Sequence, residues 1–213
     1  MGTGGTYFTT ANLESLFAGT FPGVTLAADS AVGIDTSAGD YAYTYTGTSA
    51  YGFAKTGANK LTVTGASTYT GSTFVYGGTL QLAPTTAAGA TDSLSGAGST
   101  VVLTGGTLGL SQDKSGDVTF ETVDFADNLG VTLASAITVG RAGGGSSTGP
   151  STFQQAANKT IREAALDLGP YVLTVTPSNG FGLEISGATT ISTTVGASLN
   201  VGGTQNRSEE RRV

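Results

Sequence analysis

The chain has 213 residues, a formal net charge of −6 and a pI near 4.4. Glycine is very frequent, with 34 residues, while charged residues make up only 11% and hydrophobic residues 38%. This hydrophobic content is enough to bury a core, which excludes the intrinsically disordered class. The acidic balance, with no basic cluster to offset it, argues against nucleic-acid binding. The absence of cysteine excludes a disulfide framework, and no apolar run approaches the roughly 20 residues of a membrane helix.

The N-terminal segment differs from the rest of the chain. Residues 1–6 have neither the basic start nor the apolar run of a signal peptide, so we expect any export signal to lie outside this sequence. Thr10 is expected to cap a short helix that ends at Gly19. Residues 1–40 would then form an N-terminal cap with the first strands, and the helix would hide the open end of a core. The apolar face of this helix would consist of Leu13, Leu16 and Phe17.

Three tyrosines follow the cap at alternate positions. Tyr41, Tyr43 and Tyr45 would project from one face of a single strand. Aromatic faces can stack on sugar rings, which makes this row a weak candidate for ligand binding. The favoured interpretation is that the three rings cover the junction between the cap and the following domain.

The region from residue 41 to residue 206 is built from short, similar segments. The sequence of residues 77–82, Gly-Gly-Thr-Leu-Gln-Leu, returns at residues 105–110, and a looser copy occupies residues 196–201. Apolar residues two positions apart alternate with Thr, Ser and Gln, as strands with one inward face require, and glycines separate the strands. A β-sandwich and a parallel β-helix both fit such strands, but the varied spacing and the repeated copies favour the β-helix. The predicted core residues are Leu61, Leu80, Leu82, Leu103, Leu108 and Leu110.

The densest acidic stretch lies between residues 113 and 127. Its carboxylates are weak candidates for a metal or catalytic site, although strand periodicity prevents Asp117, Glu121 and Asp124 from sharing one face. Solvated loop and rim charges are the favoured interpretation, and no cofactor or metal is expected. The chain has no His, which removes histidine-based triads and the usual zinc ligand sets. The metal candidates are Asp113, Asp117, Asp124 and Asp127.

Two further segments are set apart by composition. Residues 141–158 contain three consecutive glycines and a proline, and they are predicted to form a loop that leaves the β-helix. Residues 207–213 carry three basic residues and match the translation of a common sequencing-adapter DNA. We expect this tail to be artefactual and to take no part in the fold, a natural solvated tail being the alternative.

Residues 53–82 resemble the passenger-associated transport repeat, also called the autotransporter-associated β-strand repeat. The family pattern is a K-x-G-x-G-x-L-T-L-x-G-x-N-T-Y-T-G-G-T-x-V-x-x-G-T-L-x-L run. Ser67 stands where the family usually has Asn, and Ser72 where it has the second Gly. The matching residues are Lys55, Gly57, Leu61, Thr62, Gly65, Thr68, Tyr69, Thr70, Gly71, Thr73, Val75, Gly78, Thr79, Leu80 and Leu82.

The resemblance implies a right-handed parallel β-helix in a secreted or surface-anchored bacterial protein. In autotransporters the repeat aids export and folding of the passenger, so we expect a non-enzymatic stalk or passenger segment with a role in display or adhesion. The expected partners are neighbouring repeats of the same parent chain and host-surface or matrix glycans, with no nucleic acid and no membrane span in this segment. The alternative is a carbohydrate-binding or carbohydrate-degrading β-helix protein. The residues expected to define the structural repeat are Leu61, Gly65, Tyr69, Gly71, Gly78, Leu80, Leu82, Gly106, Leu108 and Leu110.

Overall fold

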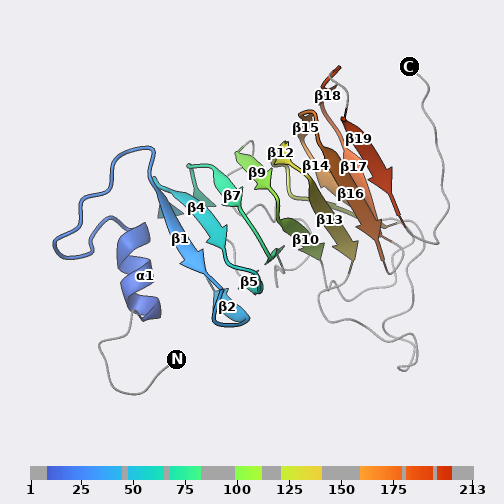
Figure 1. The fold of residues 1–213 in the computed structure, drawn as a ribbon. Coiled ribbons are helices and arrows are strands. Elements are labelled where there is room, and N and C mark those ends of the chain that lie inside the picture. The colour runs from blue at the N-terminus through green and yellow to red at the C-terminus, as the bar shows by residue number, and fades with distance from the viewer. Residues whose placement is uncertain are drawn as a thin grey trace, which may run out of the picture.

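Figure 1 shows a computed structural model of the chain. The structure describes residues 9–44, 48–64, 68–82, 99–111, 121–140, 159–178, 181–193 and 196–202. The predicted loop at 141–158 and the predicted tail at 207–213 lie outside these ranges.

Helix α1 (Thr10–Phe17) opens the described part and covers the first strands. Its N-cap is Thr9 rather than the predicted Thr10, because the Thr9 hydroxyl accepts a hydrogen bond from the Asn12 amide while the Asn12 side chain accepts one from the Thr9 amide. This reciprocal capping box satisfies two backbone donors that a helix start otherwise leaves open. The predicted end is confirmed, since Gly19 follows the last turn with a φ of 68°.

Parallel strands form the rest of the described chain. Sheet A has the strand order β1-β4-β7-β9-β12-β15-β18, and sheet B has the order β19-β16-β13-β10-β8-β5-β2. Two smaller sheets, β3-β6 and β11-β14-β17, make a third side. The bounds are β1 Ala31–Asp35, β2 Tyr41–Thr44, β3 Thr48–Ser49, β4 Gly52–Thr56, β5 Lys60–Thr64, β6 Thr68–Tyr69, β7 Thr73–Val75, β8 Thr79–Leu82, β9 Thr100–Thr104, β10 Thr107–Ser111, β11 Glu121–Asp124, β12 Asn128–Leu133, β13 Ser135–Gly140, β14 Lys159–Glu163, β15 Ala165–Leu168, β16 Val172–Pro177, β17 Phe181–Ile185, β18 Thr189–Ile191 and β19 Ser198–Val201.

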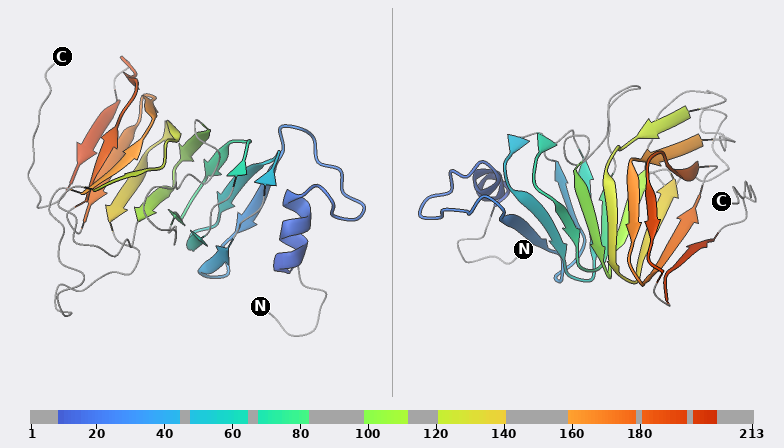
Figure 2. Two further views of the ribbon diagram at one scale, coloured as in Figure 1. Left: turned by 180° about the vertical axis from the view of Figure 1, so that it is seen from behind. Right: turned by 90° about the horizontal axis from the view of Figure 1, so that it is seen from above.

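This topology is a parallel β-helix, as predicted, and not a sandwich of hairpins. The chain passes from sheet A to sheet B and back again, so that each circuit, or rung, lays one strand on each seven-stranded sheet. The seven described rungs begin at β1, β4, β7, β9, β12, β15 and β18, and the strands follow one another from α1 to β19 (Figure 2). The spacing between stacked residues varies: Thr44 lies beside Thr64, 20 positions on, whereas Thr104 lies beside Thr132, 28 positions on.

The core consists of inward side chains stacked in columns along the helix axis. On sheet B one column runs Leu61, Leu80, Leu108, Ile137, Val175 and Val201. The pairing of β8 with β10 places Leu80 beside Leu108 and Leu82 beside Leu110, which is the stacking that the repeated Gly-Gly-Thr-Leu-x-Leu segment predicted. The six predicted core leucines are each at most 2% exposed, which confirms that assignment. The part of the chain that the structure describes contains no helix long and apolar enough to cross a membrane.

Candidate functional site

The side chain that most distinguishes residues 53–82 is a lysine inside the core. Lys55 lies in an inward column of sheet A, between Ile34 of the previous rung and Val75 of the next. It is 0% exposed. Its three neighbours further along this column are Leu103, Val131 and Leu168, so Lys55 occupies a position that other rungs fill with aliphatic residues.

The Lys55 ammonium binds the corner between sheets A and B in two successive rungs. Its Nζ donates to the carbonyl oxygens of Thr56 at 2.7 Å and Gly57 at 2.8 Å, both in its own rung. It also donates to the Gly77 carbonyl of the next rung, at 3.0 Å. An ammonium group has three N–H donors, and here all three are used, which offsets much of the cost of burying the charge. Lys55 therefore acts as a clamp between two rungs.

Charge and burial act on this lysine in opposite directions. Burial lowers the pKa of Lys55 below its ordinary value, and the carboxylate of Asp35 in the preceding rung partly opposes that shift. The pKa of Asp35 is itself lowered, chiefly because its carboxylate accepts hydrogen bonds from the Ser37 hydroxyl and amide, at 2.7 and 3.0 Å. Asp35 thus supplies a fixed negative charge near the clamp.

A second contact between rungs involves a buried tyrosine. Tyr69 is 2% exposed, and its ring packs on Phe53 with a centroid distance of 6.4 Å. Its hydroxyl forms a hydrogen bond with the hydroxyl of Thr73, which is 0% exposed and begins β7 of the next rung. The Tyr69–Thr73 pair therefore joins the third side of one rung to sheet A of the next.

Two glycines of the repeat allow the backbones of successive rungs to touch. A Cβ on Gly71 would lie 2.3 Å from the Gly52 nitrogen, so no larger residue fits without separating the rungs. Gly78 has a φ of 59°, and a Cβ there would lie 2.4 Å from the Asn59 carbonyl oxygen. The corner is not identical in the later copy, since Gly105 rather than Gly106 has the positive φ, at 94°.

The predicted repeat residues fall on this inter-rung interface. Leu61, Leu80, Leu82, Leu108 and Leu110 line the core, and Gly106 packs so closely that a Cβ would lie 2.6 Å from a Val75 methyl group. Gly65 lies outside the described residues.

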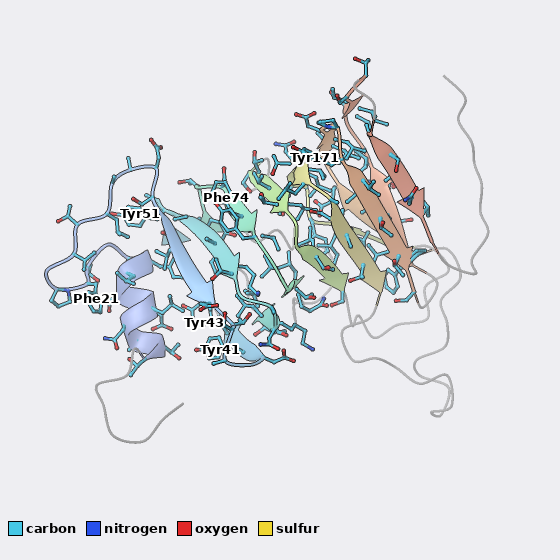
Figure 3. All side chains as sticks on the ribbon, viewed as in Figure 1. Phe21, Tyr41, Tyr43, Tyr51, Phe74 and Tyr171 are labelled. Carbon is cyan, nitrogen blue, oxygen red and sulfur yellow. The ribbon has the colours of Figure 1, made fainter. Side chains whose placement is uncertain are left out.

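Tyr41 and Tyr43 of the predicted tyrosine row lie at the junction between α1 and the first rungs (Figure 3). Tyr43 is 3% exposed, and its ring stacks on Phe17 of α1 at 6.5 Å with an interplanar angle of 14°. Tyr41 is half-buried, with its hydroxyl 3.3 Å from that of Thr10, and Tyr45 lies outside the described residues. A ring covered in this way, as Tyr43 is, offers no free face for a sugar.

Two of the four acidic candidates, Asp124 and Asp127, lie in the described part of the chain. Asp113 and Asp117 lie outside the described residues, and Asp124 lies on β11, while Asp127 is 1% exposed at the corner before β12. The Asp127 carboxylate accepts a hydrogen bond from the Ser99 hydroxyl at 3.0 Å, and its amide donates to the Glu163 carboxylate at 3.0 Å. Within the described ranges, no three Asp or Glu side chains come together as metal ligands would.

Sequence reasoning missed two features that the structure reveals. The first is Glu163, which is 0% exposed and meets Asp127 across a gap of 36 positions. The second is an outward pair of rings, Phe74 and Tyr76, on and just after β7. In the sequence these two rings belong to the alternation Thr73, Phe74, Val75, Tyr76. Either the first and third or the second and fourth of these residues could face inward.

Comparison with known families identifies the segment that carries the clamp. The model of the passenger-associated-transport-repeat matches residues 53–82. Neither the curated proteins nor the solved structures contain a match to the chain. The matched segment runs from β4 to β8, one complete rung and two strands of the next, and thus includes both sides of the contacts made by Lys55 and Tyr69. Residues 53–82 are therefore a passenger-associated-transport-repeat, the repeat of autotransporter passengers, within a longer parallel β-helix.

Proposed function

We propose that this chain is a non-enzymatic scaffold segment in the passenger of a bacterial autotransporter-like protein, secreted or held at the cell surface. The observation that carries the proposal is the use of the repeat's distinctive side chains. Lys55, Tyr69 and Gly71 all serve contacts between one rung and the next. A segment whose most characteristic side chains hold neighbouring rungs together is suited to an extended structural role.

The same contacts support a role in export and folding. Each rung is paired with the rung before it, so a chain that emerges gradually can add one rung at a time to a folded base. The inward columns then give each new rung an apolar surface to bury. Folding outside the membrane in this way would favour forward movement of the chain, because a folded rung cannot return through a narrow passage.

Neighbouring repeats of the parent chain are the proposed partners at the β18–β19 end. The inward residues of this last described rung remain exposed: Ile191 at 48%, Leu199 at 44% and Val201 at 72%. Each continues a column that is buried in the rungs before it, and β18 and β19 are edge strands of their sheets. A further rung in the same register would cover these side chains, as each rung covers the one before it.

The test is to add such a rung. A second copy of residues 53–82 joined after residue 202 should raise the melting temperature by several degrees and add parallel-strand content. The matched control is the same extension with serine in place of its inward leucines, which should give no increase. Equal melting temperatures for the two extended chains would contradict the proposed stacking.

Export is tested separately. The chain is placed between a signal peptide and an autotransporter translocator, and protease-resistant protein at the cell surface is measured. We expect display with the native chain and a marked loss with Leu80→Asp, because a rung that cannot fold cannot support the next. Equal surface display of the native chain and of Leu80→Asp would contradict a role for rung folding in export.

Carbohydrate degradation is the alternative, and the buried acids give it little support. Asp127 and Glu163 are 1% and 0% exposed, so these carboxylates do not reach a substrate at the surface. The measurement is reducing-sugar release from plant and bacterial polysaccharides. Turnover that disappears in Asp127→Asn or Glu163→Gln would replace the scaffold proposal with an enzymatic one.

A further inference from the structure

Helix α1 covers the first rung through side-chain contacts. The Phe17 ring stacks on Tyr43 and Phe53, and the Thr10 hydroxyl lies 3.3 Å from the hydroxyl of Tyr41. Among the described residues, no backbone hydrogen bond joins α1 to β1 or β2. Both are edge strands, so each has one side on which no further strand is paired. The helix therefore hides the inward side chains of the first rung but does not take the place of a paired strand.

The segment between α1 and β1 allows the helix to move without the rung. Residues 18–30 connect the two elements, and most of their side chains are exposed. Gly19 and Gly23, near the helix, have φ values of 68° and 76°, which glycine adopts without strain. Leu26, nearer to β1, packs against the core. Figure 1 shows the segment as a wide loop outside the stack of strands, so a change at the two glycines would move α1 and leave β1 in place.

The opposite end of the molecule matches the surface beneath α1. The described strands of the two large sheets pair in parallel, so the β18–β19 end of one copy can meet β1 and β2 of a second copy as one rung meets the next. In that register Ile191 would lie beside Ile34 of the second copy, because both belong to one column of sheet A. Val201 would likewise lie beside Tyr41, in a column of sheet B. Ile191 and Val201 are exposed, so this contact would bury apolar surface that each copy leaves in water.

Helix α1 occupies the place of such a docking rung. Val32 and Ile34 are buried in the same core cluster as Leu13 and Phe17 of the helix. Figure 2 shows α1 at the end of the stack, in line with the succession of strands. Its outward residues include the exposed Glu14, and a helix offers no open strand edge. A second copy can therefore reach β1 and β2 only after α1 has moved aside.

We propose that α1 is a removable cap, which keeps the β18–β19 end of a second copy of this chain from docking on β1 and β2. Displacement of the helix allows head-to-tail stacking, and since every added copy again presents a β18–β19 end, the contact does not close and gives a filament. The proposal goes beyond the scaffold function, from which it takes only the stacking of a rung on the β18–β19 end. A chain that folds one rung at a time presents such an end at every stage, so the cap keeps copies separate during export.

The first experiment gives each chain one competent end, in variants of the whole chain studied by size-exclusion chromatography with light scattering. Leu13→Asp/Phe17→Asp should displace the helix, because both side chains are buried and the new charges have no partner. This displaced-helix variant should form species at multiples of the 21.1 kDa monomer, while the native chain stays monomeric. Added Val201→Asp removes the variant's own docking end, so this triple variant should be monomeric alone. Mixed with the native chain, whose β18–β19 end is intact, it should form a dimer with one copy of each.

The matched control is Ala11→Asp/Thr20→Asp, which adds the same charge at exposed positions and should stay monomeric. A displaced-helix variant that keeps the native circular dichroism spectrum and remains monomeric would overturn the proposal. Association of the native chain to the same extent would also overturn it, because the cap would then block nothing. Oligomers that persist with Val201→Asp would do the same, by indicating unspecific aggregation or exchange of α1 between copies.

The second experiment displaces α1 after folding, and it decides the case in which the charged variant does not fold. A protease cleavage sequence is placed after Gly23, the folded chain is cut, and the released segment is removed by size-exclusion chromatography. The chain has no cysteine, so Gly33→Cys and Thr190→Cys provide a specific cross-link. These outward positions share a column of sheet A and would be neighbours across the contact, and a Cβ on Gly33 has no neighbour closer than 4.0 Å.

Chains that carry one or the other cysteine are mixed under mild oxidation. We expect a disulfide between the two kinds of chain after cleavage and not before, and less of it when the released segment is added back. No disulfide after cleavage, equal amounts without cleavage, or a segment that stays bound to the cut chain would each overturn the proposal. Rung addition is measured within one capped chain, so failure of head-to-tail docking would leave that result and the scaffold proposal untouched.

Discussion

The inward side chains of this β-helix are covered at one end and exposed at the other. At the α1 end, Val32 and Ile34 are 5% and 8% exposed, with helix α1 packed against the same core. At the β19 end, Ile191 and Val201 are 48% and 72% exposed. Both ends have parallel strands paired in register to an adjacent rung, so the strands themselves do not depend on being covered.

The difference shows where the stabilising free energy lies. Pairing to one neighbour is enough to set the conformation of a rung, while burial of its inward side chains needs a neighbour on both sides. The hydrophobic contribution therefore belongs to interfaces between rungs and not to the rungs themselves. A helix with aromatic side chains can replace a rung at one end, as Phe17 does with stacking distances of 6.5 Å to Tyr43 and 6.2 Å to Phe53.

The largest effect is expected for a charge placed within a covered part of a column. Leu80→Asp should lower the free energy of unfolding by roughly 5 kcal/mol, because Leu80 is 0% exposed and an aspartate there has no partner. Val201→Asp, in the same column, should change it by less than about 0.5 kcal/mol. Urea denaturation followed by circular dichroism gives both values, and comparable losses would contradict the difference between the ends.

Removal of the cap should be the next largest effect. Phe17→Ala should cost about 4 kcal/mol, since the ring is 2% exposed and packs between two other rings. Ile191→Ala at the open end should cost well under about 1 kcal/mol. Hydrogen exchange provides the readout by region: amides of β1 and β4 should lose protection in Phe17→Ala, while those of β15 and β16 keep it. Equal loss of protection in every rung of the β-helix would mean that α1 stabilises more than the first rungs.

The next effect in order of size is expected for the Lys55 clamp in the sheet A column. Lys55→Met keeps much of the side-chain volume but removes the donor to three carbonyl groups, and it should cost about 3 kcal/mol. Ile191→Lys, at the open end of the same column, should be nearly neutral because its ammonium reaches water. Thermal denaturation compares the two. A more stable Lys55→Met chain would show that the lysine is retained for something other than stability.

The smaller contact between rungs is the tyrosine hydroxyl. Tyr69→Phe should cost about 1.5 kcal/mol, because it leaves the buried Thr73 hydroxyl without this partner. The double variant Tyr69→Phe/Thr73→Val should recover part of that loss, since both polar groups are then gone. A double-mutant cycle measures the coupling, and a coupling energy of zero would mean that the hydrogen bond does not stabilise the fold.

The sequence predicted the architecture because its signal is local and repeated. Inward residues two apart and the returning Gly-Gly-Thr-Leu-x-Leu segment are enough to place Leu80 on Leu108. The contacts at corners were not predictable in the same way. Burial of Lys55 depends on which carbonyl groups meet it from the next rung, and the Asp127–Glu163 contact depends on a register set across 36 positions. Tyr41 and Tyr43 lie on one strand next to α1, as the alternation and the expected cap predicted, while Tyr45 lies outside the described residues.

The outward ring pair of Phe74 and Tyr76 had to come from the structure for a related reason. Period-two alternation assigns the apolar residues of a strand to the core, but in β7 both faces of the alternation contain apolar residues. Thr73 and Val75 occupy the inward side while the larger Phe74 lies outside. On the inward side the Thr73 hydroxyl is hydrogen-bonded to Tyr69 of the preceding rung, and Val75 continues the inward column between Lys55 and Leu103.

The smallest effect expected is the pH dependence that Lys55 gives to the column. Burial lowers the pKa of Lys55 in the folded chain below the value of 10.5 that it has when exposed. Between these two pKa values the unfolded chain binds more protons, so stability should rise with pH in that window relative to Lys55→Met, and show no such dependence below the folded pKa. Asp35→Asn should extend the window to lower pH, because loss of the Asp35 charge lowers the folded pKa of Lys55 while the upper limit stays at the exposed value. Nitrogen-detected NMR of the lysine side chain follows the titration directly. A folded pKa above 10.5 would mean that the carbonyl groups and Asp35 outweigh burial, and the charge would then stabilise an inward position that aliphatic residues fill elsewhere in the column.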